Sequence, residues 1–179
     1  MSQAPSISSQ SFEGTRITVD SSKPFDEVVS ALYLSIGSAS DIGKWMDVTK
    51  NIKLYSDEAR DEFTSSTKKA IGPHGFMIFQ EFNHGAWIPL FGVGGGLKMK
   101  RIILGNPLIA ITMLKRELTT GLFVPVEILV IEKETNGGTK VVYTLPSCLI
   151  AGLNKDEELL KAVKVLDGKL EALARDILA

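Results

Sequence analysis

The chain has 179 residues, of which 44% are hydrophobic and 23% are charged, enough for one domain with a sizeable core. Its 20 basic residues nearly balance its 21 acidic residues, which argues against a nucleic-acid-binding surface, because such a surface needs a strong basic field. Cys148 is the single cysteine, which excludes an intrachain disulfide and favours a reducing, cytoplasmic location.

The N-terminus is expected to be a disordered tail over residues 1–11, followed by a single α+β domain over residues 12–179. The tail is rich in Ser and Gln and has neither a basic start nor a long apolar core, so it does not read as a secretory signal. The most apolar window, Ile102–Leu114, is interrupted by Gly105, Asn106 and Pro107. It is shorter than the roughly 20 residues that cross a bilayer, so no membrane span is expected.

A strand and a helix are predicted first. Ile17 and Val19 alternate with polar residues, which predicts a strand within Phe12–Val19. Pro24 then begins a helix whose apolar positions recur at steps of three and four residues, and Gly37 ends it.

The next stretch, Ser38–Gly75, is interpreted as an elaboration between two strands, with a charged surface helix at Asp57–Ile71. A strand at Phe76–Phe82 follows, and then an irregular apolar stretch, Asn83–Phe91, and the glycine cluster Gly92–Gly96. The cluster lacks the Lys-Ser/Thr of a phosphate-binding loop and precedes a strand, not a helix. A hairpin loop or lid is therefore favoured over an anion site.

An extended run, Lys98–Leu104, is followed by Asn106-Pro107, which predicts a short helix. Asn is a favoured N-cap, and Pro is tolerated at the first helical position, where its missing N–H has no intrahelical partner. Strands are predicted at Val124–Glu132 and Thr139–Leu145. The sequence Asn136-Gly137-Gly138 between them is typical of a hairpin turn, because such turns need positive φ.

The last predicted element is a helix of about two dozen residues, with Asn154 as its N-cap and Glu157 completing a capping box. Its apolar residues form one stripe: Leu159, Val163, Leu166, Leu170, Leu173 and Ile177. We expect this helix to cover the concave side of a curved sheet and to leave a cavity beneath it, with Gly168 thinning one wall.

The predicted elements follow the order β-α-(insertion)-β-β-α-β-β-α and include three distinctive segments: Gly75–Glu81 (GFMIFQE), Leu104–Ala110 (LGNPLIA) and Leu122–Val130 (LFVPVEILV). In these segments the chain resembles the family called domain of unknown function 302, and the resemblance covers about Phe12 to Ser147. The resemblance implies an α+β fold with an antiparallel sheet and helices packed on one face, like the TATA-binding-protein or helix-grip architectures, here with a long C-terminal helix. It makes a homodimer plausible and implies no reaction and no cofactor.

Two positions depart from the family pattern. Members often have a cysteine just before the Asn-Pro and a basic residue after the strand-opening proline, whereas this chain has Gly105 and Glu127 there. A thiol or a cation at these places is therefore not expected to have a role in this chain.

Three residues are candidate acid–base groups: Glu127, His84 and Glu81. Glu127 is expected on the same strand face as Leu129 and Ile131, where burial would raise the pKa of its carboxyl. The alternative for Glu127 is a salt bridge to Lys100 or Arg101. His84 follows Glu81 closely, and its alternative is a loop residue that caps backbone groups. No metal site is expected, because the sequence has no H-x-E or CxxC spacing.

Four residues are candidate ligand contacts: Trp87 and Phe91 in the apolar stretch, Asn106, and Tyr143. The favoured function is a binding module for a small apolar or amphipathic molecule in a cavity between the sheet and the C-terminal helix. One alternative is a cofactor-independent isomerase, cyclase or lyase that uses the three acid–base candidates. Another is a homo-oligomeric interaction protein that pairs through the Trp87–Phe91 patch or an open strand edge.

Overall fold

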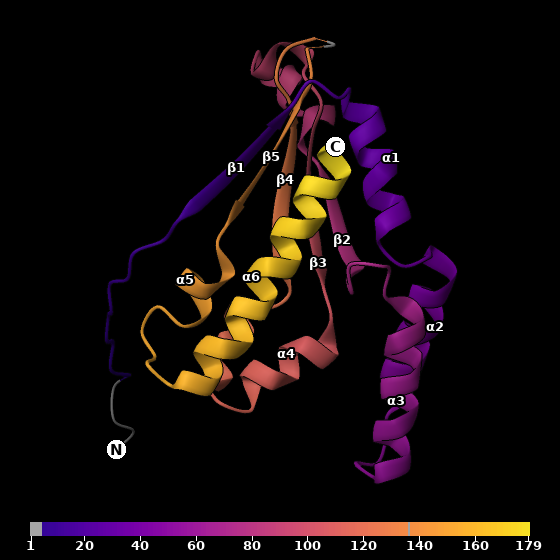
Figure 1. The fold of residues 1–179 in the computed structure, drawn as a ribbon, viewed down its shortest axis with the longest axis vertical. Helices are drawn as coiled ribbons and strands as arrows, with labels where there is room; N and C mark the ends of the chain where they lie inside the picture. Colours follow the sequence, from indigo (N-terminus) through magenta and orange to yellow (C-terminus); the bar gives the residue numbers. More distant parts are fainter. Residues whose placement is uncertain (1–4, 136) are drawn as a thin grey trace.

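The computed structural model describes residues 5–135 and 137–179 of the chain (Figure 1). Its centre is a five-stranded antiparallel sheet of order β1-β5-β4-β3-β2. The strands are β1 (Arg16–Ser21), β2 (Met77–Asn83), β3 (Met99–Gly105), β4 (Val126–Glu132) and β5 (Thr139–Thr144). The first strand thus begins four residues after the predicted Phe12. Part of the predicted tail and Asn136 of the predicted turn lie outside the described residues.

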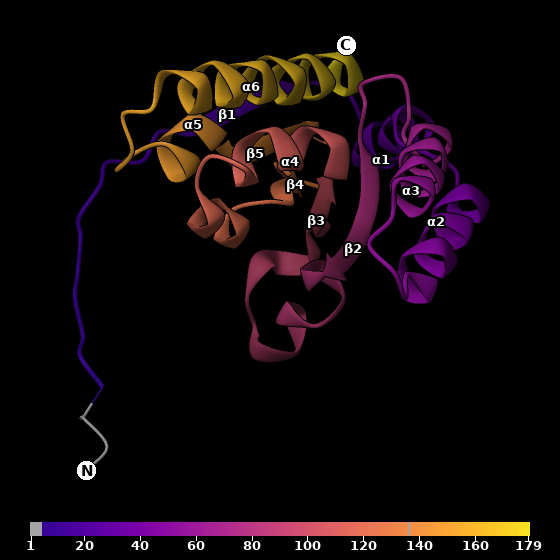
Figure 2. The same ribbon diagram turned by 90° about the horizontal axis from the view of Figure 1, so that it is seen from below.

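Three α-helices, α1, α4 and α6, lie on one face of the sheet, and α6 runs across it (Figures 1 and 2). The α-helices are α1 (Phe25–Ser35), α2 (Ala39–Asn51), α3 (Asp57–Ala70), α4 (Pro107–Leu114), α5 (Pro146–Ile150) and α6 (Glu157–Leu178). Short 3₁₀ turns connect other elements: η1 (His84–Ala86), η2 (Ile88–Phe91), η3 (Gly94–Gly96) and η4 (Leu118–Leu122). This arrangement confirms the predicted α+β fold. Among helices of the described residues, none is both long and apolar enough to cross a membrane.

The Asn-Pro sequence begins α4 as predicted. The side-chain oxygen of Asn106 accepts a hydrogen bond from the N–H of Leu108 at 2.9 Å, and Pro107 is the first helical residue. The Asn106 amide also donates to the carbonyl of Gly75 at 2.9 Å. One side chain therefore both caps α4 and fixes the chain just before β2.

The predicted stripe of α6 is buried along the whole helix. Its N-cap, however, is Asp156 and not Asn154. The Asp156 carboxylate accepts the N–H of Leu159 at 2.7 Å, while Asn154 accepts the N–H of Asp156 at 2.9 Å. Glu157 is the first residue of the helix, so the predicted capping box is wrong, because a better acceptor lies two residues further along the chain.

The two faces of the sheet differ in burial, and β4 shows this most clearly. Val126, Ile128 and Val130 are buried against the helices, whereas Glu127, Leu129 and Ile131 lie on the opposite face. We call this opposite face, to which alternate residues of all five strands contribute, the open face. In β2 the alternation of faces is interrupted by a β-bulge between Ile78 and Gln80, which inserts Phe79 as an extra residue.

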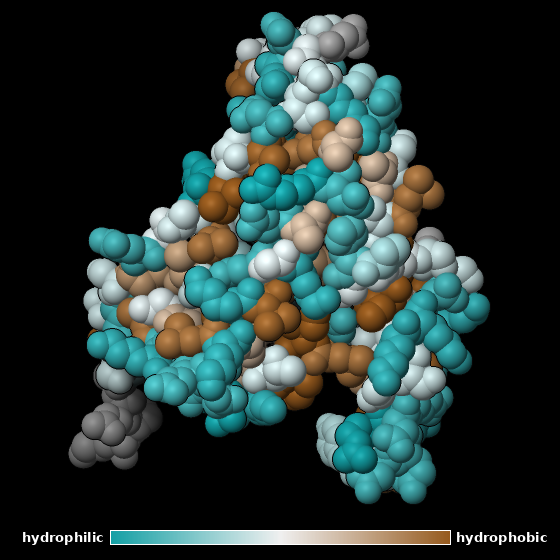
Figure 3. All heavy atoms as spheres, in the orientation of Figure 1, coloured by the Kyte–Doolittle hydropathy of each residue, from teal (hydrophilic) through white to brown (hydrophobic). Residues whose placement is uncertain are grey.

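The elaboration consists of α2 and α3, which pack together beside β2 as a lobe (Figure 2). The lobe has a small core of its own, formed by Ile42, Trp45, Ala70 and Met77. The indole N–H of Trp45 donates to the hydroxyl of Thr67 at 2.9 Å inside this core. In Figure 3 a notch separates the lower end of the lobe from the rest of the molecule.

Candidate functional site

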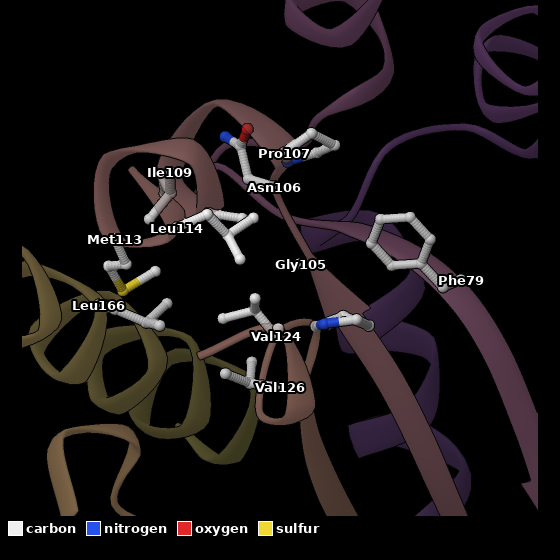
Figure 4. A pocket seen from close by; sticks show the side chains of 13 residues that line it. Phe79, Gly105, Asn106, Pro107, Ile109, Met113, Leu114, Val124, Val126 and Leu166 are labelled. Atoms are coloured by element: carbon white, nitrogen blue, oxygen red, sulfur yellow. The ribbon is translucent and has the colours of Figure 1, made fainter. Parts of the chain in front are cut away.

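A pocket of about 200 Å³ opens between α4, the ends of β3 and β4, and α6; we call it the α4 pocket (Figure 4). Its lining is almost entirely apolar: Phe79, Gly105, Asn106, Pro107, Ile109, Ala110, Met113, Leu114, Gly121, Val124, Pro125, Val126 and Leu166. Apolar side chains also gather on the surface over α4 in the space-filling view (Figure 3). Such a lining is typical of a site for a small apolar molecule.

Two local features of the sequence keep the α4 pocket open. At Gly105 an added Cβ would lie 3.0 Å from Cβ of Pro125 and 3.2 Å from Cε2 of Phe79, so any larger residue would narrow the space between these two walls. The bulge in β2 directs Phe79 to this wall, where its ring packs edge-on against Trp45 with centroids 5.6 Å apart. Neither the bulge nor this packing could be predicted from the alternation in the sequence.

Asn106, predicted as a ligand contact, is at the rim of the α4 pocket. Its amide points away from the centre of the pocket in Figure 4 and is engaged by the backbone of Gly75 and Leu108. The geometry therefore gives Asn106 a role in building the pocket wall.

The α4 pocket touches α6 at one residue, whereas the cavity was expected beneath the helix. Leu166 is the residue that α6 contributes to the lining, while the whole stripe belongs to the main hydrophobic core. Gly168 faces away from the sheet, and an added Cβ there would meet no other heavy atom within 4 Å. Gly168 thus does not thin a wall of the pocket, because it is exposed and is not part of the lining.

Glu127 forms an ion pair with Arg101, its neighbour across β3 and β4 on the open face, through both Nε and Nη2 of the guanidinium. This is one of the two salt bridges predicted as the alternative for this residue. The Glu127 side chain is 52% exposed, so the desolvation expected for an apolar strand face is largely absent. His84 and Glu127 line the same shallow groove on the open face.

His84 belongs to a row of aromatic rings at the end of this groove. Its ring stacks on that of Phe82, with ring centroids 6.3 Å apart, and meets that of Trp87 edge-on, with centroids 6.0 Å apart. The ring of Trp87 in turn meets that of Phe91 edge-on, with centroids 6.2 Å apart. The guanidinium of Arg101 lies 5.7 Å above the ring of Phe82. The structure therefore brings His84, Trp87 and Phe91 together with Arg101, and none of the four lines the α4 pocket. Trp87 is 48% and Phe91 is 75% exposed, as expected for an apolar surface patch.

Glu81, the third acid–base candidate, lies on the helix-covered face, paired in register with the buried Ile102. Its carboxylate accepts the Tyr33 hydroxyl and contacts Nζ of Lys100 at 2.7 Å. Glu81 and Glu127 are thus on opposite faces of the sheet, and Glu81 lines neither the α4 pocket nor the groove that Glu127 lines.

Tyr143 is 3% exposed and belongs to the core between the sheet and the helices. Burial raises the pKa of its hydroxyl, and the charge of Glu171 adds to this effect. Within the described residues no group of three or more His, Cys, Asp or Glu side chains is arranged to hold a metal ion.

The comparisons with known proteins agree with the resemblance seen in the sequence. The family model of the domain of unknown function DUF302 matches residues 52–177, and the chain therefore belongs to this family. The match begins at the end of α2 and extends over α6, so its limits differ from those expected, Phe12 to Ser147.

A solved structure shows the same fold. The crystal structure of an uncharacterized conserved DUF302 protein from Bacillus stearothermophilus is 19% identical, with a TM-score of 0.58 over 90% of this chain and 97% of that chain. No curated protein matches this chain. The comparisons thus support the family and the fold, and they name no function for either protein.

Proposed function

We propose that this protein is a binding module for a small, mainly apolar molecule, which it holds in the α4 pocket. The observation that carries the proposal is the pocket itself, about 200 Å³ in volume and lined by apolar side chains from α4, the sheet and α6. An apolar cavity of about 150 Å³ is enough to bind a molecule of the size of benzene. A one- or two-ring hydrocarbon or heteroaromatic compound therefore suits this pocket.

The chemistry of the lining supports binding more than catalysis at this place. Asn106 is the polar side chain of the lining, and both ends of its amide are hydrogen bonded to the backbone. The acid–base candidates Glu127, His84 and Glu81 do not line the pocket. An apolar ligand is held here by contact area and exclusion of water, about 25 cal/mol per Å² of apolar surface.

The proposal is tested by a substitution that places a larger side chain in the α4 pocket. Ala110 lines it, so Ala110→Leu should occupy part of its volume, abolish binding of indole or naphthalene, and raise the melting temperature of the free protein. Ala172→Leu makes the same substitution at an exposed position of α6 and should leave binding unchanged. Binding is measured by calorimetry and by chemical shifts of the Met113 methyl group.

Two results would contradict the proposal. One is binding of the probes with shifts confined to residues outside the pocket. The other is a folded Ala110→Leu protein that binds the probes as tightly as the original chain.

A further inference from the structure

The open face carries a depression whose lining shares no residue with that of the α4 pocket. It is a groove of about 580 Å³ to which β1, β3, β4 and β5 contribute residues. Its floor is apolar: in register, Leu129 lies between Arg101 and Val142, and Ile131 lies between Met99 and Lys140. These apolar side chains are only half-buried in the chain, so a ligand can still cover them.

One end of the groove is polar and positively charged. Arg16 of β1 lies in register opposite Thr144 of β5, and Thr18 is two residues further along the same strand face. Within residues 5–135 and 137–179, the Arg16 guanidinium has no ion-pair partner, and neither threonine hydroxyl has a side-chain hydrogen bond. A cation and two hydroxyls that lie together in this way suit a carboxylate or another small anion.

The charge of the whole groove favours the same class of ligand. Lys140 adds another cation without an ion-pair partner in the described part of the chain, since Asp20 opposite it contacts Nζ of Lys133 at 3.9 Å instead. The carboxylate in the lining, that of Glu127, is neutralised by Arg101. The groove therefore has a surplus of positive charge above an apolar floor.

The groove also has room for an elongated molecule. Its lining extends over three rows of the sheet, from Arg16 and Thr144 through Thr18 and Val142 to Lys140 and Ile131. From the polar end at Arg16, the apolar floor leads over Val142 and Leu129 towards Ile131.

We infer that the open face binds an amphipathic anion. Its head is held by Arg16 between the hydroxyls of Thr18 and Thr144, and its hydrocarbon chain lies over Val142, Leu129 and Ile131. A second copy of this chain fits less well, because a two-fold contact would bring two positively charged faces together. This inference does not depend on the function proposed for the α4 pocket.

The experiment compares three probes by calorimetry and amide chemical shifts. Decanoate should bind and shift amides of β1 and β5, and the binding should weaken as salt is added. Decyltrimethylammonium, which has the same chain and the opposite charge, and acetate, which has the head alone, should bind far more weakly. Equal binding of the cationic amphiphile would overturn the inference, because the positive charge of the groove would then be irrelevant.

The variants test the head and the floor separately. Arg16→Gln should weaken decanoate binding about tenfold, the effect of losing one charge-assisted hydrogen bond. Val142→Thr, which keeps the side-chain shape, should also weaken it, whereas Arg60→Gln on α3 should have no effect. Ala110→Leu should leave decanoate binding intact, which separates this site from the α4 pocket.

Three further results would overturn the inference. One is an Arg16→Gln protein that binds decanoate as tightly as the original chain, and another is an Ala110→Leu protein that no longer binds it. The third is a concentration-dependent dimer that Arg16→Gln strengthens and that decanoate does not dissociate, which would show that a second copy covers the open face.

Discussion

Three polar side chains meet where β2 and β3 pass α1, and their ionisation is coupled. Burial alone would raise the pKa of Glu81, but the hydrogen bonds from Lys100 and Tyr33 and the charge of the lysine outweigh it and lower that pKa below its ordinary 4.5. Burial alone would lower the pKa of Lys100, but the hydrogen bonds and charge interactions with Glu81 and Tyr33 outweigh burial and raise that pKa. Burial and the bond to Glu81 together raise the pKa of the Tyr33 hydroxyl.

The cluster should therefore stabilise the fold in a defined range of pH. A carboxyl whose pKa is lowered by folding stabilises above its unfolded pKa, and this stabilisation is lost as the pH falls through the folded pKa. For Lys100 and Tyr33, whose pKa values are raised, it is present below the unfolded values of 10.5 and 10.0 and is lost at higher pH. The contribution is thus largest between the acidic and the alkaline limits.

We predict that Glu81→Gln lowers the free energy of unfolding by about 1 kcal/mol at neutral pH, as for a partly buried ion pair. The difference from the original chain should shrink as the pH falls below about 4.5, the ordinary pKa of Glu81. Urea unfolding followed by circular dichroism at several pH values measures both effects. Glu127→Gln, which breaks a more exposed pair, serves as the control and should cost less. A difference that stays constant down to pH 3 would contradict the prediction.

In the long C-terminal helix, α6, Gly168 allows the effect of helix propensity on stability to be measured without a change in packing. Gly168 is in the middle of α6 and exposed, and a methyl group there would meet nothing within 4 Å. Glycine is less favourable than alanine in a helix interior, because it loses more conformational entropy on folding.

Gly168→Ala should therefore raise the free energy of unfolding by about 0.5–1 kcal/mol. The matched control is the reverse change, Ala172→Gly, at another exposed position of α6, which should lower it by a similar amount. Urea unfolding at one pH measures both. A destabilising Gly168→Ala would show that this face of α6 packs against something.

The helices could be predicted from the sequence more completely than the details of the strands. Pro24, Asn106-Pro107 and the stripe of α6 locate helices because each acts through local backbone geometry or a period of 3.6 residues. The cap of α6 was placed two residues early, since Asn154 and Asp156 are both good acceptors and only the turn geometry selects between them. The bulge at Phe79 could not be predicted from the sequence of β2 alone, because a bulge is defined by how two strands pair.

The candidate site was predicted less well than the fold, for a reason that applies to the whole molecule. The ion pair of Glu127 with Arg101 is one of the two salt bridges that the sequence offers as the alternative for Glu127, the other being with Lys100. The α4 pocket, however, combines Phe79, Gly105 and Leu166 from three distant segments. No local pattern shows that these residues meet, since the three segments come together only in the folded chain.

The molecule also has two separate cores, which should differ in stability. The main core joins the sheet to α1, α4 and α6, whereas the lobe of α2 and α3 is held by a few side chains around Trp45. Trp45 packs against Phe63 with ring centroids 5.9 Å apart and against Phe79, which lines the α4 pocket. A unit with so small a core is expected to open without unfolding the rest.

We predict that Trp45→Ala loosens the lobe selectively. Removing the indole leaves a cavity in the small core, and a large-to-small change of this kind costs about 3–5 kcal/mol. It also removes the hydrogen bond from the indole to Thr67. Hydrogen exchange followed by mass spectrometry should show faster exchange over residues 39–70, while β4, β5 and α6 keep their protection. Met46→Ala, next to Trp45 and half exposed, should leave the pattern unchanged.

Because Phe79 joins the lobe to the α4 pocket, Trp45→Ala should also weaken binding of indole there. Equal acceleration of exchange along the whole chain would instead show that the lobe and the sheet unfold as one unit.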